Sequence, residues 1–218
     1  MEKVKVGVLG SGDVGRVLAA GFLKVGHAVR IGSRSPEKLK DWVAGAGEGA
    51  SAGTFAEAAQ FGDILVLATH GNATLNAIEM AGTGNFAGKT VIDATNPLDI
   101  ANGAPKLSVG FNDSLGEQVQ RLLPDAHVVK AFNTVGNPYM INPQLPGGPP
   151  TMFIAGNDAG AKKLVTQICK VWGWEVADLG GIDSSRSDFS FFVAFSACGM
   201  EFPAMSAAFQ FGEGLVGE

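Results

Sequence analysis

The stretch VKVGVLGSGDVG, residues 4–15, decides the fold. Residues 4–9 form an apolar run that is typical of a buried β-strand, and residues 14–25 place apolar side chains at helical spacing. Gly26 ends that helix, and residues 28–32 form a second apolar run. This order of strand, helix and strand predicts a βαβ unit with parallel strands, and it places the glycines in the turn between the first strand and the helix.

The glycines have the spacing GxGxxG. In such a turn the first glycine permits a tight bend, the second lets the backbone approach a pyrophosphate, and the third lets the helix pack closely on the strand. Free N–H groups and the positive dipole end of the helix attract phosphates. We therefore predict a dinucleotide site on this turn, and a tight turn that binds nothing is the alternative. The predicted contacts are Gly10, Ser11, Gly12, Asp13, Val14 and Gly15.

The alternation of strands and helices continues along the chain. A short third strand is expected within residues 44–54, which are rich in Gly, Ala and Ser. Further strands are predicted at 63–69, 89–95, 127–131, 151–155 and 174–178. Helices are predicted from Pro36, at 55–61, after His70, and at 114–123 and 159–172. Ser35 is expected to cap the helix from Pro36, and Ser114 and Glu117 have the spacing of a capping box. Repeated βα units predict an α/β protein of Rossmann type, with a doubly wound, mostly parallel sheet over residues 1–180. Residues 181–218 are expected to add a small C-terminal helical lobe that is not an independent domain.

Composition argues against several functional classes. The net charge is −5 and no basic run occurs, so we expect no nucleic-acid partner. The two cysteines, Cys169 and Cys198, have no CxxC spacing, and we predict neither a disulfide framework nor a metal site. No secretory leader is recognisable, which favours a cytoplasmic protein.

The most apolar stretch runs from Phe189 to Phe211. Glu201 and Pro203 interrupt it, and its uncharged pieces are shorter than the roughly 20 residues that a membrane span needs. We therefore expect no membrane insertion. A buried helix or the contact of a homodimer is the prediction for this segment.

The choice between NAD and NADP is made at the end of the second strand, where an acidic residue would bind the ribose 2′-hydroxyl. No carboxylate occurs between Ile31 and Pro36. Basic and hydroxyl side chains occupy this region instead, and they suit a 2′-phosphate. We predict NADP(H), although the two basic residues could also be solvated surface charges. The predicted contacts are Ser33, Arg34, Ser35 and Lys38.

Five motifs follow one another along the chain, and they are the glycine turn, GSR at 32–34, VIDATNPL at 91–98, SLGE at 114–117 and VVKAFNT at 128–134. In the order and spacing of these motifs the chain resembles the F420-dependent NADP oxidoreductases and the N-terminal reductase domains of the metalloreductases. The resemblance implies an NADP(H)-dependent enzyme that passes hydride between the nicotinamide and a small-molecule acceptor. F420, FMN or FAD is the implied second substrate.

The same resemblance implies cofactor contacts after three further strands, where open α/β sheets bind ligands. For each of these residues a purely structural role remains the alternative. Asp93, inside a strand, is expected to be structural. The implied contacts are Thr69, His70 and Gly71, then Thr95, Asn96 and Pro97, and finally Ala131, Asn133, Thr134, Val135 and Asn137.

The chain departs from the family after Ile182, and this departure leaves the identity of the acceptor open. We nominate no catalytic acid or base, because direct hydride transfer requires positioning and exclusion of water. An imine or carbonyl reductase of the β-hydroxyacid dehydrogenase type is one alternative function. A non-catalytic NADP sensor is the other.

Overall fold

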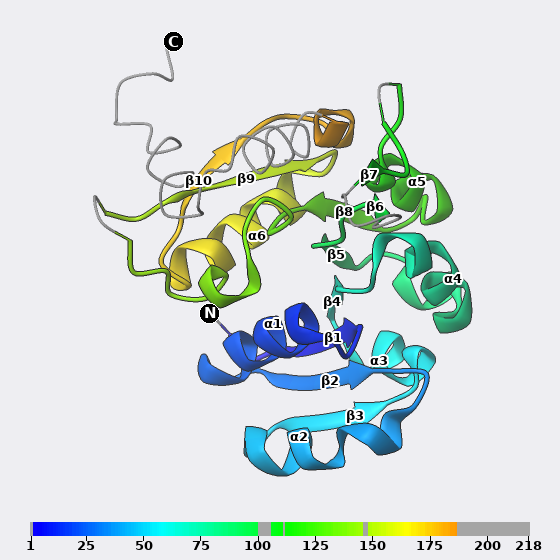
Figure 1. Cartoon of the computed structure of the whole chain (residues 1–218), viewed down its shortest axis with the longest axis vertical. Coiled ribbons are helices and arrows are strands. Elements are labelled where there is room, and N and C mark those ends of the chain that lie inside the picture. The colour runs from blue at the N-terminus through cyan, green and yellow to red at the C-terminus, as the bar shows by residue number, and fades with distance from the viewer. Residues whose placement is uncertain (1, 100–105, 111, 146–147, 187–218) are drawn as a thin grey trace.

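The computed structural model describes residues 2–99, 106–110, 112–145 and 148–186 (Figure 1). Eight strands form one sheet in the order β10-β9-β8-β5-β4-β1-β2-β3. They are β1 (Lys5–Leu9), β2 (Ala28–Gly32), β3 (Ala50–Gly53), β4 (Ile64–Leu67), β5 (Thr90–Asp93), β8 (His127–Lys130), β9 (Thr151–Gly156) and β10 (Glu175–Asp178). A separate small ladder, which the sequence did not predict, pairs β6 (Leu98–Asp99) with β7 (Lys106–Leu107).

Helices cover both faces of the sheet (Figure 1). The α-helices are α1 (Asp13–Lys24), α2 (Lys40–Ala46), α3 (Phe55–Phe61), α4 (Gly71–Ala81), α5 (Leu115–Leu122) and α6 (Ala159–Val171). The short 3₁₀ helices are η1 (Pro36–Leu39), η2 (Thr83–Phe86), η4 (Asn137–Tyr139) and η5 (Ile182–Ser184). The single helix expected from Pro36 is therefore divided into η1 and α2.

Successive residues of a strand point to opposite faces of the sheet, and one hydrophobic core lies on each face. Val6 and Val8 of β1 belong to a core with Phe22 of α1 and Ile168 of α6. Leu9 belongs to the opposite core, which α3, α4 and α5 cover. Burial on both faces accounts for the apolar runs in the sequence, and the structure confirms the doubly wound α/β fold.

The sheet is parallel from β8 to β3, and β9 then pairs antiparallel with β8. A parallel partner requires a crossover that usually contains an α-helix. In the described part of the connection between β8 and β9, the only helix is η4. β10 follows α6 and is again parallel to its neighbour β9. The sheet is mostly parallel, as predicted, with two strands reversed.

The strands that precede the predicted cofactor contacts end side by side, because their last residues are paired with one another. Leu9 is paired with Gly32 on one side and with Leu67 on the other. Leu67 is paired with Asp93, and Asp93 with Lys130. Every segment predicted to contact the cofactor therefore begins at the same edge of the sheet.

One of the two predicted helix caps forms. Ser35 occupies the N-cap position of η1, but its side chain makes no capping hydrogen bond. Ser114 caps α5 as predicted, because its Oγ accepts the N–H of Glu117. The capping box itself is incomplete, since the Glu117 carboxylate accepts hydrogen bonds from the Ser114 hydroxyl and from Arg186 and not from the Ser114 N–H. The expected C-terminal lobe beyond Arg186 lies outside the described residues, as do Phe189 to Phe211 and the homodimer contact predicted there.

A complete capping box stabilises α3. Thr54 Oγ1 accepts the N–H of Glu57, and Glu57 Oε2 accepts the N–H of Thr54. We expect Thr54→Ala to lower the free energy of unfolding by about 1 kcal/mol. Ser35→Ala is the matched control, because Ser35 holds the same position without a capping bond. Chemical denaturation without ligand measures both variants, and equal losses would contradict the assignment.

Candidate functional site

The glycine turn packs backbone against backbone. Gly10 has a φ of 129°, and a Cβ there would lie 2.3 Å from the carbonyl oxygen of Ala68. A Cβ on Gly15 would lie 2.1 Å from the carbonyl oxygen of Gly10. Gly12 differs, because a Cβ there would meet no described atom within 4 Å. Gly10 and Gly15 thus permit close packing, and Gly12 faces open space at the N-terminus of α1.

An unforeseen basic residue supports this turn. Arg16, in the first turns of α1, donates from Nε to the carbonyl oxygen of Ser11 over 2.9 Å. The residue is exposed, so its guanidinium places positive charge beside the open turn. Asp13 is also exposed and supplies the acidic group of the first helical turn. The position of Arg16 one turn into a predicted phosphate-binding helix was the signal that could have identified it.

The end of β2 is tied to the glycine turn through hydroxyl groups. Ser33 Oγ accepts the N–H of Ser35 over 3.1 Å and a hydrogen bond from Ser11 Oγ over 3.3 Å. Arg34 and Lys38 are exposed beside this cluster, and neither forms an ion pair within the described residues. The structure therefore places a hydroxyl group between the turn and two free positive charges.

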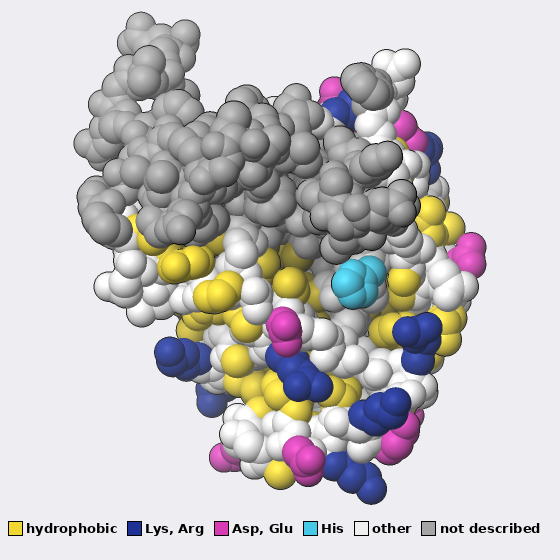
Figure 2. Space-filling view, in the orientation of Figure 1, with side chains coloured by type: hydrophobic (Ala, Val, Ile, Leu, Met, Phe, Trp, Pro, Cys, Tyr) yellow, Lys and Arg dark blue, Asp and Glu magenta, His cyan; other side chains and the backbone are white. Residues whose placement is uncertain are grey.

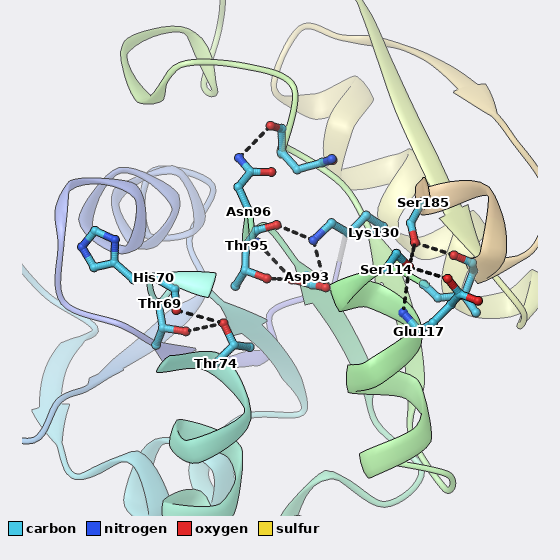
Figure 3. Close-up of polar contacts among 12 residues, drawn as sticks. Thr69, His70, Thr74, Asp93, Thr95, Asn96, Ser114, Glu117, Lys130 and Ser185 are labelled. Carbon is cyan, nitrogen blue, oxygen red and sulfur yellow. Dashed lines mark hydrogen bonds and ion pairs between the residues drawn. The ribbon is translucent and has the colours of Figure 1, made fainter. Parts of the chain in front are cut away.

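The loop after β4 and the start of α4 lie in the middle of the sheet edge at which the strands of the predicted site end (Figure 3). Thr69 Oγ1 lies 3.0 Å from Thr74 Oγ1, and Thr74 donates to the carbonyl oxygen of His70. His70 is exposed, whereas Gly71 is buried. A Cβ on Gly71 would lie 2.2 Å from the carbonyl oxygen of Asn96. Close packing at Gly71 thus holds α4 against the loop after β5.

A buried ionic network joins the ends of β5 and β8 (Figure 3). Lys130 Nζ lies 3.0 Å from Asp93 Oδ2 and also donates to the carbonyl oxygen of Thr95. Asp93 Oδ1 accepts hydrogen bonds from both the N–H and the hydroxyl of Thr95. These contacts give Asp93 the structural role that its place in the strand suggests. Lys130 was not predicted, although opposite charges at the ends of two apolar strands were a usable signal.

Asn96 and Asn133 lie together beyond this network. Asn96 Nδ2 donates to the carbonyl oxygen of Asn133 over 2.9 Å. Asn96 Oδ1 and both side-chain polar atoms of Asn133 are buried and have no hydrogen-bond partner among the described residues. Leaving a buried polar group unpaired costs about 1–3 kcal/mol. Together these atoms offer one N–H₂ donor and two oxygen acceptors, which complement the single acceptor and two N–H groups of a carboxamide.

The other residues predicted after β5 and β8 occupy different environments. The side chains of Thr95 and Ala131 are only 1% and 0% exposed, and Val135 packs in the hydrophobic core. Pro97 is buried, Thr134 is half-buried, and Asn137 begins η4. Phe132 has a φ of 66°, unusual for a residue with a side chain, and it turns the chain sharply after β8. Asn133 therefore follows a turn of the chain and does not continue the line of β8.

Titratable groups elsewhere have structural explanations. Burial raises the pKa of Cys169 to about 12, so its thiol is protonated at neutral pH. Burial lowers the pKa of His27, whose Nδ1 accepts the N–H of Val4. His127 lies at the start of β8 with Nδ1 3.7 Å from Asp158 Oδ2. Within the described residues no cluster of His, Cys, Asp and Glu could hold a metal ion, and no helix is long and apolar enough to cross a membrane.

A second polar network fixes the last described residues against α5. The hydrogen bonds of Arg186 hold the pKa of Glu117 below its usual value, and Ser114 Oγ lies 2.7 Å from Ser185 Oγ. A Cβ on Gly116 would lie 2.9 Å from Ser185 Oγ. The SLGE motif, residues 114–117, thus forms the surface against which residues 182–186 are bound. Sequence reasoning missed this pairing because 69 residues separate Arg186 from Glu117.

Charged side chains do not gather into a basic patch on the visible face. Figure 2 shows Lys and Arg side chains that lie apart from one another, with acidic side chains between them. Among the residues around the glycine turn and the end of β2, the exposed basic side chains are Arg16, Arg34 and Lys38.

The glycine packing predicts different stabilities for two alanine variants. Gly15→Ala forces a Cβ against the Gly10 carbonyl, and we expect a loss of about 1–3 kcal/mol in the free energy of unfolding. Gly12→Ala meets open space at a φ of −74°, so its loss should stay below about 1 kcal/mol. Denaturant titration of the ligand-free proteins checks this order. A Gly15→Ala protein as stable as the wild type would show that close packing here is dispensable.

The chain is similar to known reductases in sequence and structure. The family described as coenzyme F420-dependent NADP oxidoreductase matches residues 5–97. A crystal structure from Arthrobacter sp. FB24, of a protein provisionally assigned as an F420-dependent NADP reductase, is 36% identical. The two structures superpose with a TM-score of 0.83, over 90% of this chain and 96% of that chain. The F420-dependent NADP reductase of Methanothermobacter marburgensis is 29% identical over 84% of this chain and 87% of its own length.

A further similarity concerns part of a longer protein. Metalloreductase STEAP3 of Rattus norvegicus is 29% identical over 85% of this chain. The chain spans 36% of the length of that metalloreductase. The similarity therefore extends to about a third of the metalloreductase and does not include the remainder.

Proposed function

The chain belongs to the family of coenzyme F420-dependent NADP oxidoreductases, and we propose that it binds NADP(H) and passes hydride between the nicotinamide and a flavin- or deazaflavin-like acceptor. F420, FMN and FAD are the candidate second substrates. The proposed NADP(H)-binding unit is residues 1–180. In this proposal the acceptor is a small molecule, and residues 181–218 contribute to its site and to a homodimer.

The observation that carries the proposal is the contrast among the three glycines of the first turn. Gly10 and Gly15 are closed by backbone contacts, whereas no described atom lies within 4 Å of a Cβ on Gly12. A pyrophosphate needs this open approach to the N-terminus of a helix. α1 has no side-chain cap at Gly12, so its first N–H groups remain available to phosphate oxygens.

Charge and hydroxyl groups at the end of β2 support the assignment of NADP(H). Arg34 can pair with a 2′-phosphate through two parallel hydrogen bonds, and Lys38 adds a second positive charge. The Ser33 hydroxyl already accepts the Ser35 N–H, which leaves its own hydrogen to donate. An acidic residue that would bind the ribose of NAD is missing between Ile31 and Pro36.

The unpaired amides at the other end of the edge suit the nicotinamide. Asn133 Nδ2 would donate to the carboxamide oxygen, and the oxygens of Asn96 and Asn133 would accept the carboxamide N–H₂ group. Because these polar atoms are buried and unpaired, Asn96 and Asn133 fit the carboxamide of a nicotinamide. The proposed set of cofactor contacts is completed by Asp13, Val14, Thr69, His70, Gly71, Thr95, Pro97, Ala131, Thr134, Val135 and Asn137, of which Thr95 and Ala131 would contribute backbone atoms.

In this proposal the protein contributes binding, orientation and a dry environment. A bound dinucleotide would supply a hydride, which is two electrons with one hydrogen nucleus, and water would supply the further proton of the reduced acceptor. The Asn96 and Asn133 amides would fix the plane of the ring, and the close contact at Gly71 would hold the loop that carries Asn96 against α4. Positioning of this kind can supply a large part of a rate enhancement without a general acid or base.

The choice of acceptor is tested by following NADPH oxidation through the absorbance of the reduced nicotinamide. Separate reactions contain F420, FMN, FAD, a ferric chelate or a cyclic imine. We expect turnover with a flavin- or deazaflavin-like acceptor, and F420 is the preferred candidate. Turnover confined to the imine would favour the imine-reductase alternative. NADPH binding without oxidation of any of these would contradict the proposed hydride transfer.

The 2′-phosphate site is tested with Arg34→Glu. We expect the Kd for NADPH to rise about 10- to 100-fold, because a charged hydrogen bond is lost and a like charge is introduced. The Kd for NADH should change little. Lys163→Glu, an identical charge change at an exposed residue of α6, is the control. An unchanged ratio of the two Kd values in Arg34→Glu would refute the assignment.

A further inference from the structure

Lys130 is a charged residue in an unusual environment. It ends the apolar strand β8 and is 3% exposed, and its register partner Asp93 is 0% exposed. Removing two charges from water carries a large desolvation cost, and well-packed apolar side chains would often serve stability equally well. The ion pair therefore calls for a reason beyond the stability of the sheet.

The network joins two loops that both belong to the proposed nicotinamide end. Lys130 Nζ donates to the carbonyl oxygen of Thr95, so a residue of β8 holds the loop after β5. One residue further on, Asn96 Nδ2 donates to the carbonyl oxygen of Asn133, so the loop after β5 holds the loop after β8. Figure 3 shows these two cross-connections in sequence, from Lys130 through Thr95 to Asn96.

The bonds of Asp93 complete the geometry. Its Oδ1 binds the N–H and hydroxyl of Thr95, while its Oδ2 binds Lys130. Thr95 is thus held at its N–H, its hydroxyl and its carbonyl oxygen, which leaves its backbone little freedom. The next residue, Asn96, carries one of the unpaired amide oxygens.

We propose that Lys130 is a positioning residue, which together with Asp93 fixes the Asn96 and Asn133 amides for the carboxamide of the nicotinamide. Lys130 itself does not touch the dinucleotide in this role. The inference rests on the proposed function, because it assumes that NADP(H) binds along this edge. It adds that the nicotinamide end is organised by a buried charge pair, independently of the phosphate sites at Gly12 and Arg34.

The test compares two ligands on a charge-neutral double variant, Lys130→Met with Asp93→Asn. The double variant leaves no unpaired buried charge, and the introduced amide retains an oxygen for Thr95. Isothermal titration measures the Kd of NADPH and of 2′,5′-ADP, which has the adenine and 2′-phosphate but lacks the nicotinamide. Lys89→Met is the matched control, because Lys89 Nζ also donates to a backbone carbonyl, that of Ala59, next to the opposite end of β5.

We expect the double variant to bind 2′,5′-ADP as the wild type does and NADPH at least about tenfold more weakly. Lys89→Met should leave both Kd values unchanged. Equal weakening of both ligands, or no change in either, would overturn the positioning role. If the wild type bound neither ligand, the proposed function itself would fail, which is a separate result.

A second variant guards against loss of the fold. Asp93→Asn alone keeps the size of the side chain and one acceptor, and thermal unfolding reports whether it folds. A selective loss of NADPH affinity in this variant would support the proposal. If both variants failed to fold, the pair would belong to stability alone, and the proposal would be wrong.

Discussion

Close contact between backbones in the first turn is the constraint on which the rest of the structure depends. Gly15 lies against the carbonyl of Gly10, and Gly10 lies against Ala68 after β4. This packing holds the start of α1 against the ends of β1 and β4, which are parallel neighbours. The chain order changes direction here, since β2 and β3 extend the sheet on one side and β4, β5 and β8 on the other. Ligands of open α/β sheets bind at such a switch point.

Most of the fold could be predicted from the sequence because its signals are local. β2 and α3 begin and end at the predicted residues, since their apolar patterns and flanking glycines act within a few positions. The direction of β9 could not be read in this way, because it depends on how the chain returns from β8. The division of the helix after Pro36 also escaped prediction, and no side-chain cap from Ser35 marks its start.

The candidate site likewise contains residues that local sequence signals predicted and residues that depend on contacts between distant parts of the chain. The glycine turn and Arg34 belong to motifs with a fixed spacing, so the sequence alone pointed to them. Lys130 and Asp93 are 37 residues apart, and only the strand register brings their charges together. The unpaired state of Asn133 is a property of burial and neighbours, and no pattern of residue types encodes it. Non-local contacts and desolvation therefore account for what sequence reasoning missed.

The two ends of the proposed site would hold the dinucleotide by different physics. Arg34 and Lys38 are exposed, so their attraction for a phosphate acts through water and weakens as salt is added. The amides of Asn96 and Asn133 are buried, where hydrogen bonds are stronger and depend more on geometry than on ionic strength. Hydride transfer is sensitive to the placement of the ring far more than to the grip on the phosphates. A costly buried pair such as Lys130 with Asp93 would therefore be useful at the proposed nicotinamide end, and exposed charges would suffice at the other.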